Sequence, residues 1–258
     1  MTEEKYKMND YIIAEDYTLP SKGKVYSKEI NPNIKLRSMT TREEMKRQNP
    51  SKKTYKNLCE IIDDCLVEKP GISCYDMCLG DYQFLLHKIR VVTYGPQYKT
   101  ELRCPYCGCT NSRTINLEDL DVHEYSQDVD KYLELDLPKT KKHIKLKLQT
   151  PRILDDIDTE AKERRKKSPN SNQEPAFLLS IESVIDEVDG EKLDFIQMED
   201  FVKSLPMLDT NYIIKYSEKL NEMMGVDTRV QDTCDVCGLE YNATFRITAE
   251  FFGPEIDI

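Results

Sequence analysis

Two short cysteine motifs constrain this chain more than any other feature of its sequence. Residues 104–108 (CPYCG) and 234–238 (CDVCG) share the pattern Cys-x-x-Cys-Gly. In such a zinc knuckle a tight turn directs two thiolates toward one point, and the glycine accommodates a positive φ. Two knuckles supply four thiolates, which complete a tetrahedral site without an open position. The sequence therefore predicts a structural Zn²⁺ ion, and its ligands are Cys104, Cys107, Cys234 and Cys237.

The distance between the motifs predicts a zinc ribbon that is divided along the chain. The second motif begins at residue 234, far beyond the spacer of about 15–20 residues that a compact ribbon contains. We therefore expect an α+β fold with a split four-Cys zinc ribbon. Its two halves are residues 98–117 and 226–254, and an inserted α+β domain occupies residues 118–225.

The residues around each motif support this interpretation. A strand is expected at 98–103, before the first knuckle, and a returning strand at 112–117. A strand is also expected at 241–247, after the second knuckle. Strand, knuckle and strand in succession is the context that a zinc ribbon requires.

The chain before the ribbon is predicted to contain an arm and a helical region. Residues 1–18 are polar and show no structural period, so we expect a flexible N-terminal arm that orders only against a partner. Residues 19–97 are predicted to form a strand followed by helices. The expected elements are a strand at 34–39, a capping-box helix from Thr40 or Thr41 that ends before Pro50, a helix from Ser51 to about residue 68, and a central core helix over 74–94.

The insertion is predicted to contain a hairpin and helices. Residues 132–137 and 144–148 both alternate between apolar and polar side chains, so they are expected to pair. Opposed charges would help this pairing, with Glu134 and Asp136 facing Lys145 and Lys147. Two amphipathic helices are expected at 198–205 and 211–224, the second closed by Gly225.

Composition favours a protein that binds other proteins. The net charge of −10 argues against a chain that wraps nucleic acid, because neutralising phosphates needs a concentrated positive surface. The 15 tyrosines suit half-exposed interface positions. No apolar run approaches the roughly 18 residues of a membrane span, and the polar start is unlike a signal peptide. We therefore expect a cytoplasmic protein without a membrane span.

The other cysteines have different interpretations. Cys59 and Cys65 fall in an apolar stripe and are expected in the core. Cys74 and Cys78 would share a helix face, which a metal could use, although core packing is the simpler interpretation. Cys109 could replace a neighbouring ligand, but a single intervening residue strains a knuckle, so its participation stays open.

Two further motifs carry alternatives. Residues 104–107 resemble a redox Cys-x-x-Cys pair, but they lack the strand-to-helix context of one. The basic run 161–167 fits a phosphate-binding arm or, more simply, a solvated helix end. His87 is expected to be an ordinary core or surface histidine. No phosphate loop, nucleophile elbow or His-Glu-x-x-His motif is present, so we expect no enzymatic activity.

The order of several segments carries a resemblance. These segments are 19–26 (LPSKGKVY), 36–44 (LRSMTTREE), 85–98 (LLHKIRVVTYGPQY), the first knuckle, the second cysteine pair and Phe251-Phe252. Together they are similar to the baseplate proteins of T-even-like contractile-tailed bacteriophages. Those proteins are hub or hub-assembly subunits, and some carry a split four-Cys zinc module that closes near the C-terminus.

The resemblance implies a structural or assembly role in a baseplate hub, without enzymatic activity. The implied partners are other phage baseplate and tail proteins in a hetero-oligomeric assembly. The implied locations are the host cytoplasm during assembly and the tail baseplate of the virion.

The alternative from another class is a zinc-ribbon nucleic-acid-binding protein. That function predicts basic and aromatic residues around the knuckles. The second knuckle instead offers Asp232, Asp235 and Glu240, and only Arg103 and Arg113 flank the first.

Overall fold

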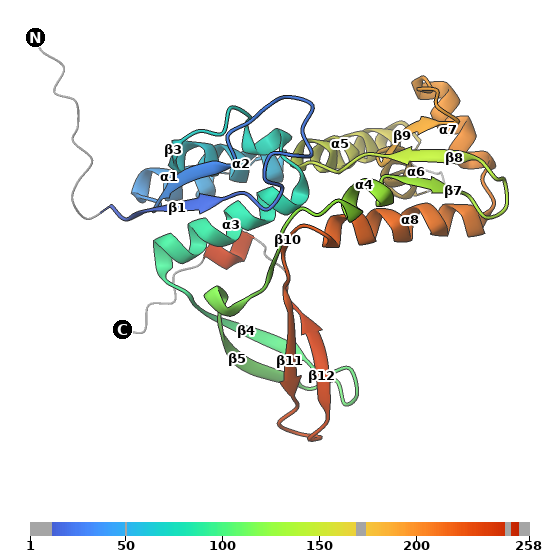
Figure 1. The fold of residues 1–258 in the computed structure, drawn as a ribbon. Helices are drawn as coiled ribbons and strands as arrows, with labels where there is room; N and C mark the ends of the chain where they lie inside the picture. Colours follow the sequence, from blue (N-terminus) through green and yellow to red (C-terminus); the bar gives the residue numbers. More distant parts are fainter. Residues whose placement is uncertain (1–11, 50, 169–173, 246–248, 253–258) are drawn as a thin grey trace, which may run out of the picture.

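The computed structural model describes residues 12–49, 51–168, 174–245 and 249–252. Two α+β bodies lie side by side, and a pair of β-hairpins projects from the region where they meet (Figure 1). The first body comes from the N-terminal part of the chain and the second from the insertion. The expected α+β class is confirmed.

The N-terminal body packs helices on a small antiparallel sheet. The sheet has the order β1 (Ala14–Thr18), β2 (Asn33–Arg37) and β3 (Leu66–Glu68). The helices are α1 (Thr41–Gln48), α2 (Thr54–Cys65), the short 3₁₀ turn η1 (Cys74–Asp76) and α3 (Leu79–Tyr94). Helix α3 is buried on most of its circumference, as expected for the central core helix. Cys59 and Cys65 are buried in the same core, as predicted.

Three expectations for this body are wrong in part. The helix expected from Ser51 to about residue 68 is α2 alone, because residues 66–68 form β3. Residues 1–11 of the predicted arm lie outside the described residues, but residues 14–18 form β1 and pair with β2. The strand lies at a sheet edge and keeps most side chains in solvent, so its sequence shows little apolar period. The expected helix over 74–94 is interrupted, because Cys78 has extended backbone and caps α3. Cys74 and Cys78 therefore do not share a helix face, and they belong to different cores.

A local sequence signal predicts the start of α1. Thr40 caps α1 and forms a capping box with Glu43, as predicted.

Asp81 of α3 is fully buried and anchors the turn at residues 19–26. Its carboxylate accepts hydrogen bonds from the Ser21 N–H at 2.9 Å and the Tyr26 hydroxyl at 2.6 Å. These bonds explain why a polar turn lies tightly against the core helix.

Over its described residues, the second body consists of a three-stranded sheet and five helices. The sheet order is β7 (Glu134–Asp136), β8 (His143–Leu146) and β9 (Ile185–Val188). The helices are α4 (Asp128–Tyr132), α5 (Pro151–Lys167), α6 (Pro175–Glu182), α7 (Phe195–Ser204) and α8 (Met207–Glu222). The basic run lies in the last two turns of α5, which agrees with its interpretation as a helix end.

The predicted hairpin of this body is confirmed, and its charge pairing is confirmed in part. Glu134 is in register with Lys145, whereas Asp136 lies opposite His143. Lys145 forms its ion pair with Glu187 of β9, because the third strand lies on its other side. Lys147 follows the end of β8.

Helix α8 ends before Gly225, which lies in the next strand and does not cap the helix.

The bodies meet where α3 crosses a short strand. Strand β10 (Gly225–Val226) pairs with β6 (Val122–His123) and contacts α3. The backbones are so close that a β-carbon on Gly80 would lie 2.6 Å from the Met224 carbonyl oxygen. A β-carbon on Gly225 would lie 2.9 Å from the Gly80 Cα, and Gly225 has a φ of 108°. A side chain at either position would clash with the facing backbone, so this close approach requires glycine at both.

The C-terminal segment η3 (Ala249–Phe252) also joins parts of the molecule. Phe252 packs in the core of the N-terminal body, whereas Phe251 packs in the core of the hairpins. The buried Arg90 of α3 donates to the carbonyl oxygens of Phe251 and Gly95, both at 2.9 Å. Arg90 thus ties the C-terminal segment at Phe251 to the end of α3 at Gly95.

Replacing Gly80 with Ala should test the crossing. The added methyl group meets a backbone carbonyl that cannot rotate away, so we expect Gly80→Ala to lower stability by about 1–3 kcal/mol, the usual cost of overpacking. The measurement is the midpoint of thermal unfolding. Gln83→Ala, at an exposed position of the same helix, is the control and should change little. Equal midpoints for the two variants would contradict the close approach.

Candidate metal centre

Each knuckle is the turn of one β-hairpin. Strands β4 (Gln97–Arg103) and β5 (Thr110–Asn116) carry the first, and β11 (Arg229–Thr233) and β12 (Glu240–Thr244) carry the second. The predicted strands around both motifs are confirmed over the described residues. Residues 246–248 of the expected last strand lie outside them.

The two knuckles have the same backbone. In the first, the Cys104 N–H donates to the Cys109 carbonyl at 2.9 Å, and the Gly108 N–H donates to the Cys104 carbonyl at 3.0 Å. The corresponding bonds of the second knuckle measure 3.1 and 2.9 Å. Gly108 and Gly238 have φ values of 74° and 70°. Their positive φ explains the glycine at the end of each motif.

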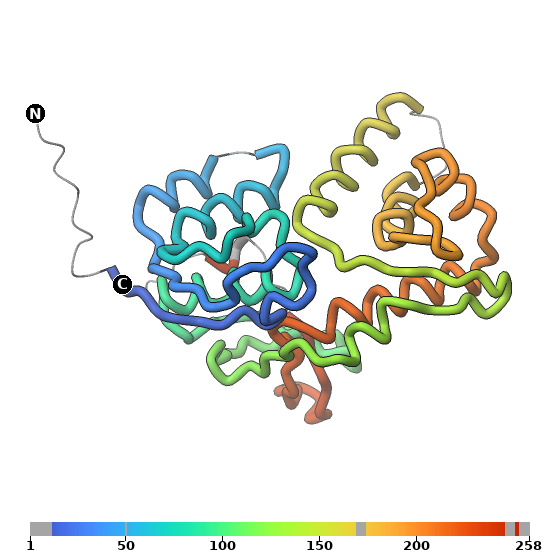
Figure 2. The backbone as a smooth tube through the Cα atoms, turned by 45° about the horizontal axis from the view of Figure 1, so that its top comes forward, coloured from blue at the N-terminus to red at the C-terminus, as the bar shows by residue number. Residues whose placement is uncertain are grey.

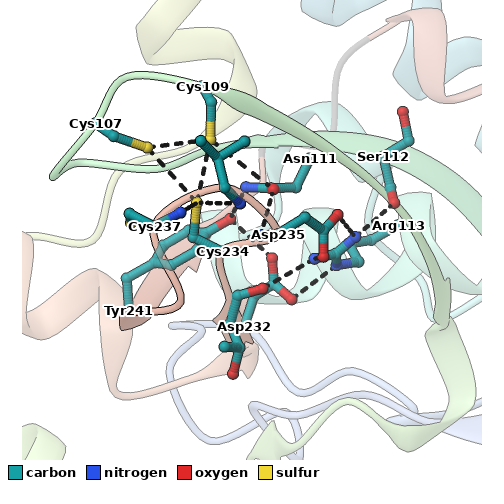
Figure 3. Close-up of polar contacts among 12 residues, drawn as sticks. Cys107, Cys109, Asn111, Ser112, Arg113, Asp232, Cys234, Asp235, Cys237 and Tyr241 are labelled. Atoms are coloured by element: carbon teal, nitrogen blue, oxygen red, sulfur yellow. Dashed lines mark hydrogen bonds and ion pairs between the residues drawn. The ribbon is translucent and has the colours of Figure 1, made fainter.

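The two hairpins bring the four predicted ligands together, and Figure 3 labels three of them, Cys107, Cys234 and Cys237. The sulfur atoms of Cys104, Cys107, Cys234 and Cys237 all lie within 4.8 Å of one another. The Cys104–Cys237 and Cys107–Cys234 sulfur distances are 3.8 and 3.6 Å. A tetrahedral zinc ion with Zn–S bonds of about 2.3 Å needs edges of about 3.8 Å. The donor set therefore fits a closed four-thiolate zinc site.

Backbone N–H groups also favour the thiolate form of one predicted ligand, Cys234. The Cys234 sulfur accepts hydrogen bonds from the N–H groups of Cys237 and Val236, both at 3.4 Å. These bonds, that of Cys237 first, lower the pKa of the Cys234 thiol to about 5. The thiolate is the form that binds zinc.

Cys109 lies beside this set of four. Its sulfur is 3.2 Å from that of Cys107 and 3.1 Å from that of Cys234. Both distances are shorter than a tetrahedral edge, and Cys109 is not one of the four sulfurs that lie mutually within 4.8 Å. The structure thus brings a fifth thiol to the edge of the site.

A polar network that the sequence did not reveal joins the hairpins beneath the sulfurs (Figure 3). Asn111 of β5 is buried. Its amide nitrogen donates to the Tyr241 hydroxyl at 3.0 Å, and its carbonyl oxygen accepts from the Asp235 N–H at 3.1 Å. Tyr241 in turn donates to Asp232 at 2.8 Å. Asn111 therefore connects one hairpin to both the knuckle and a strand of the other.

Arg113 forms the outer part of the network. Its guanidinium donates to Asp232 at 2.7 Å and, through two nitrogens, to Asp235 at 2.8 and 2.7 Å. It also donates to the Thr233 carbonyl at 2.9 Å. The charge of this residue is thus matched by two carboxylates of the opposite hairpin, and Arg113 acts as a link between the hairpins.

The other residues considered as ligands lie elsewhere. Cys74 and Cys78 are buried in the cores of the two bodies. His87 is buried on α3, and its Nε2 lies 2.9 Å from the Leu117 carbonyl. Burial lowers the pKa of His87 to about 4, so the ring is neutral at physiological pH. This histidine belongs to the core, as expected.

Comparison with known proteins relates the chain to a bacteriophage family. A family model described as T4 bacteriophage base plate protein matches residues 11–253, a span that includes both bodies and both knuckles. No curated protein and no solved structure matches the chain.

Asn111 provides a test of the network that does not involve the sulfurs. Asn111→Asp keeps the shape but cannot donate to Tyr241, so it should destabilise the hairpin pair by about 1–3 kcal/mol. Faster amide hydrogen exchange in β11 and β12 would report the loss. Asn242→Asp, an exposed change of the same charge on β12, is the control. Unchanged exchange in Asn111→Asp would show that the network does not hold the hairpins.

Proposed function

Because the chain belongs to the T4 bacteriophage base plate protein family, we propose that it is a structural or assembly subunit of the baseplate hub. The family match over residues 11–253 carries the baseplate role. The hub assignment is supported by the resemblance of segments 19–26 and 36–44 to hub and hub-assembly subunits. In this role the protein acts through contacts with other tail proteins, in the host cytoplasm during assembly and in the tail baseplate. None of the helices described has the length and apolarity to span a lipid bilayer.

The proposed metal role is a structural clasp. Cys104 and Cys107 would hold the zinc ion together with Cys234 and Cys237, and a bound zinc ion with four thiolates stabilises a fold without an open position for chemistry. The clasp would join residues 98–117 to 226–254 and close the inserted domain, residues 118–225, between them. The matching backbone of the knuckles and the spacing of the sulfurs support this proposal.

The surface around the knuckles favours protein contacts over nucleic acid. Tyr106 and Val236 are 63% and 74% exposed at the two turns, and Leu239 is exposed nearby. Exposed apolar side chains at the end of a projecting ribbon suit a protein interface. The charge of Arg113 is neutralised by Asp232 and Asp235, so it is not free to bind a phosphate.

The zinc assignment predicts a difference between two neighbouring cysteines. Cys107→Ser should lose bound zinc and unfold the ribbon, because one ligand of a closed site is removed. Cys109→Ser, at the edge of the site, should keep about one zinc ion per chain. Metal content by mass spectrometry checks both. Full zinc in Cys107→Ser, or its loss in Cys109→Ser, would refute the assigned ligand set.

The hub assignment predicts where the protein is found during assembly. In infected cells, the chain should sediment with the central part of the baseplate. Phage that lack it should accumulate tail precursors without a completed hub. Antibody detection across a sedimentation gradient gives the measurement, and a plasmid copy that restores tails is the control. Sedimentation only with peripheral baseplate parts, or normal tails without the chain, would overturn the hub assignment.

A further inference from the structure

The insertion contains a groove that the metal clasp does not explain. It has a volume of about 490 Å³ and lies between α5, α6, β9 and the start of α7. Residues of α5, α6 and α7 all line it, and Figure 2 shows the backbone of α5 set apart from the segment of α6 and α7. Its volume lies in the range of about 300–1,000 Å³ that is usual for ligand pockets. The groove is therefore large enough to receive several side chains.

The walls of the groove are mainly apolar. Helix α5 contributes Ile153 and Ile157, which are only half-buried although they lie on the inward-facing side of a helix. Leu179, Ile185, Leu193 and Met198 add to the apolar lining. Burying further apolar surface here would stabilise a complex by about 25 cal/mol per Å² before the costs of association.

An exposed aromatic ring lines the groove. Phe195, the first residue of α7, is 61% exposed and lines the groove. The Arg164 guanidinium lies 5.3 Å from the ring centre and pairs with Glu160 at 2.9 Å and Glu199 at 3.1 Å. Because Arg164 is fixed by two carboxylates, the ring is supported in an exposed position and is available to a partner.

The charged residues of the lining are mostly acidic. The carboxylates are Asp156, Glu160, Glu182, Asp186 and Asp194, and the ammonium groups are Lys147 and Lys192. Several of these are paired, including Asp156 with Lys53 and Asp186 with Lys192. Glu182 is different, because its Oε1 is buried and has no hydrogen-bond partner among the described residues. Burial raises the pKa of Glu182, and a cationic donor would relieve this unfavourable state.

From this combination we propose that the groove docks an amphipathic helix of another baseplate subunit. That helix places apolar side chains against Ile153, Ile157 and Phe195 and a Lys or Arg beside Glu182. Helix-in-groove recognition uses apolar anchors three and four residues apart, and α5 lines the groove with residues at the same spacing, 153, 156, 157 and 160. The proposal rests on the proposed assembly role, which supplies the partner, and the acidic lining selects a basic one.

A model peptide tests the chemistry of the groove. The probe is a helical peptide of about 18 residues with Leu along one face and Lys along the other, long enough to form a helix on binding. We expect the full-length protein to bind it, and to bind a version with Glu in place of Lys at least about tenfold more weakly. Titration calorimetry measures both. Equal affinity for the two peptides would overturn the charge selection.

Matched variants locate the binding. Glu182→Gln and Phe195→Ala should weaken binding of the Lys peptide by about tenfold, because each removes one central contact. Glu134→Gln has the same charge change on an exposed strand, and Ile196→Ala removes a 71% exposed neighbour that does not line the groove. Both controls should bind as the original protein does. Equal losses in variants and controls would mean non-specific attraction and overturn the proposal.

A cross-link in assembled tails tests the natural occupant. A benzophenone amino acid in place of Phe195 should attach to a basic, apolar segment of another tail protein, whereas the same group at Phe177, outside the lining, should not. Mapping the attached peptide by mass spectrometry identifies the segment. Attachment to a second copy of this chain, to nucleic acid or to nothing would overturn the proposal. Presence of the chain in tails is scored separately, so failure of the baseplate role is distinguishable from failure of the groove.

Discussion

The close crossing of α3 and β10 holds the parts of this molecule together. At this point Gly80 and Gly225 bring the backbones of the N-terminal body and the end of the insertion into direct contact. The chain enters the first hairpin just after α3 and the second hairpin just after β10. The crossing therefore brings the starts of both hairpins, and with them the two cysteine pairs, into the same region of the molecule.

A metal centre split along the sequence needs such a contact for an entropic reason. Bringing two hairpins together across a long insertion costs loop-closure entropy, although that cost grows only slowly with length. Contacts outside the ribbon offset much of this loop-closure entropy. They are the crossing, the pairing of β6 with β10 and the Arg90 bonds at the end of α3. Asn111 and Arg113 then align the knuckles through bonds of their own. The sulfurs are thus brought together by protein contacts as well as by any metal.

The sequence predicted those features that depend on neighbouring residues. The capping box of α1, the knuckles and the hairpin of the insertion each follow from a few adjacent side chains. It also predicted which four cysteines the fold brings together, because the Cys-x-x-Cys-Gly pattern is itself local. The break before α3 was missed because Cys78 and its neighbours are compatible with a helix, and the crossing with β10 lies far away in the sequence.

The remaining parts of the site depend on residues far apart in the chain. Asn111 and Arg113 have ordinary surroundings in sequence, and nothing local indicates that their partners are Tyr241, Asp232 and Asp235. The same holds for the groove, since half-buried isoleucines on α5 look like ordinary core positions until α6 and α7 are placed. Long-range polar partners and incomplete burial are properties of the tertiary structure.

The separation of the cores has a consequence for how the protein presents its surfaces. The groove belongs to the core of the insertion, whereas the knuckle turns extend from a different core that contains Cys104 and Cys234. Loss of the clasp would therefore leave the groove intact, but it would release the ribbon with its exposed Tyr106 and Val236. Two binding surfaces that are stable separately need a rigid joint if one partner assembly is to engage both at once. In the proposed assembly role, the clasp would fix the relative orientation of these surfaces.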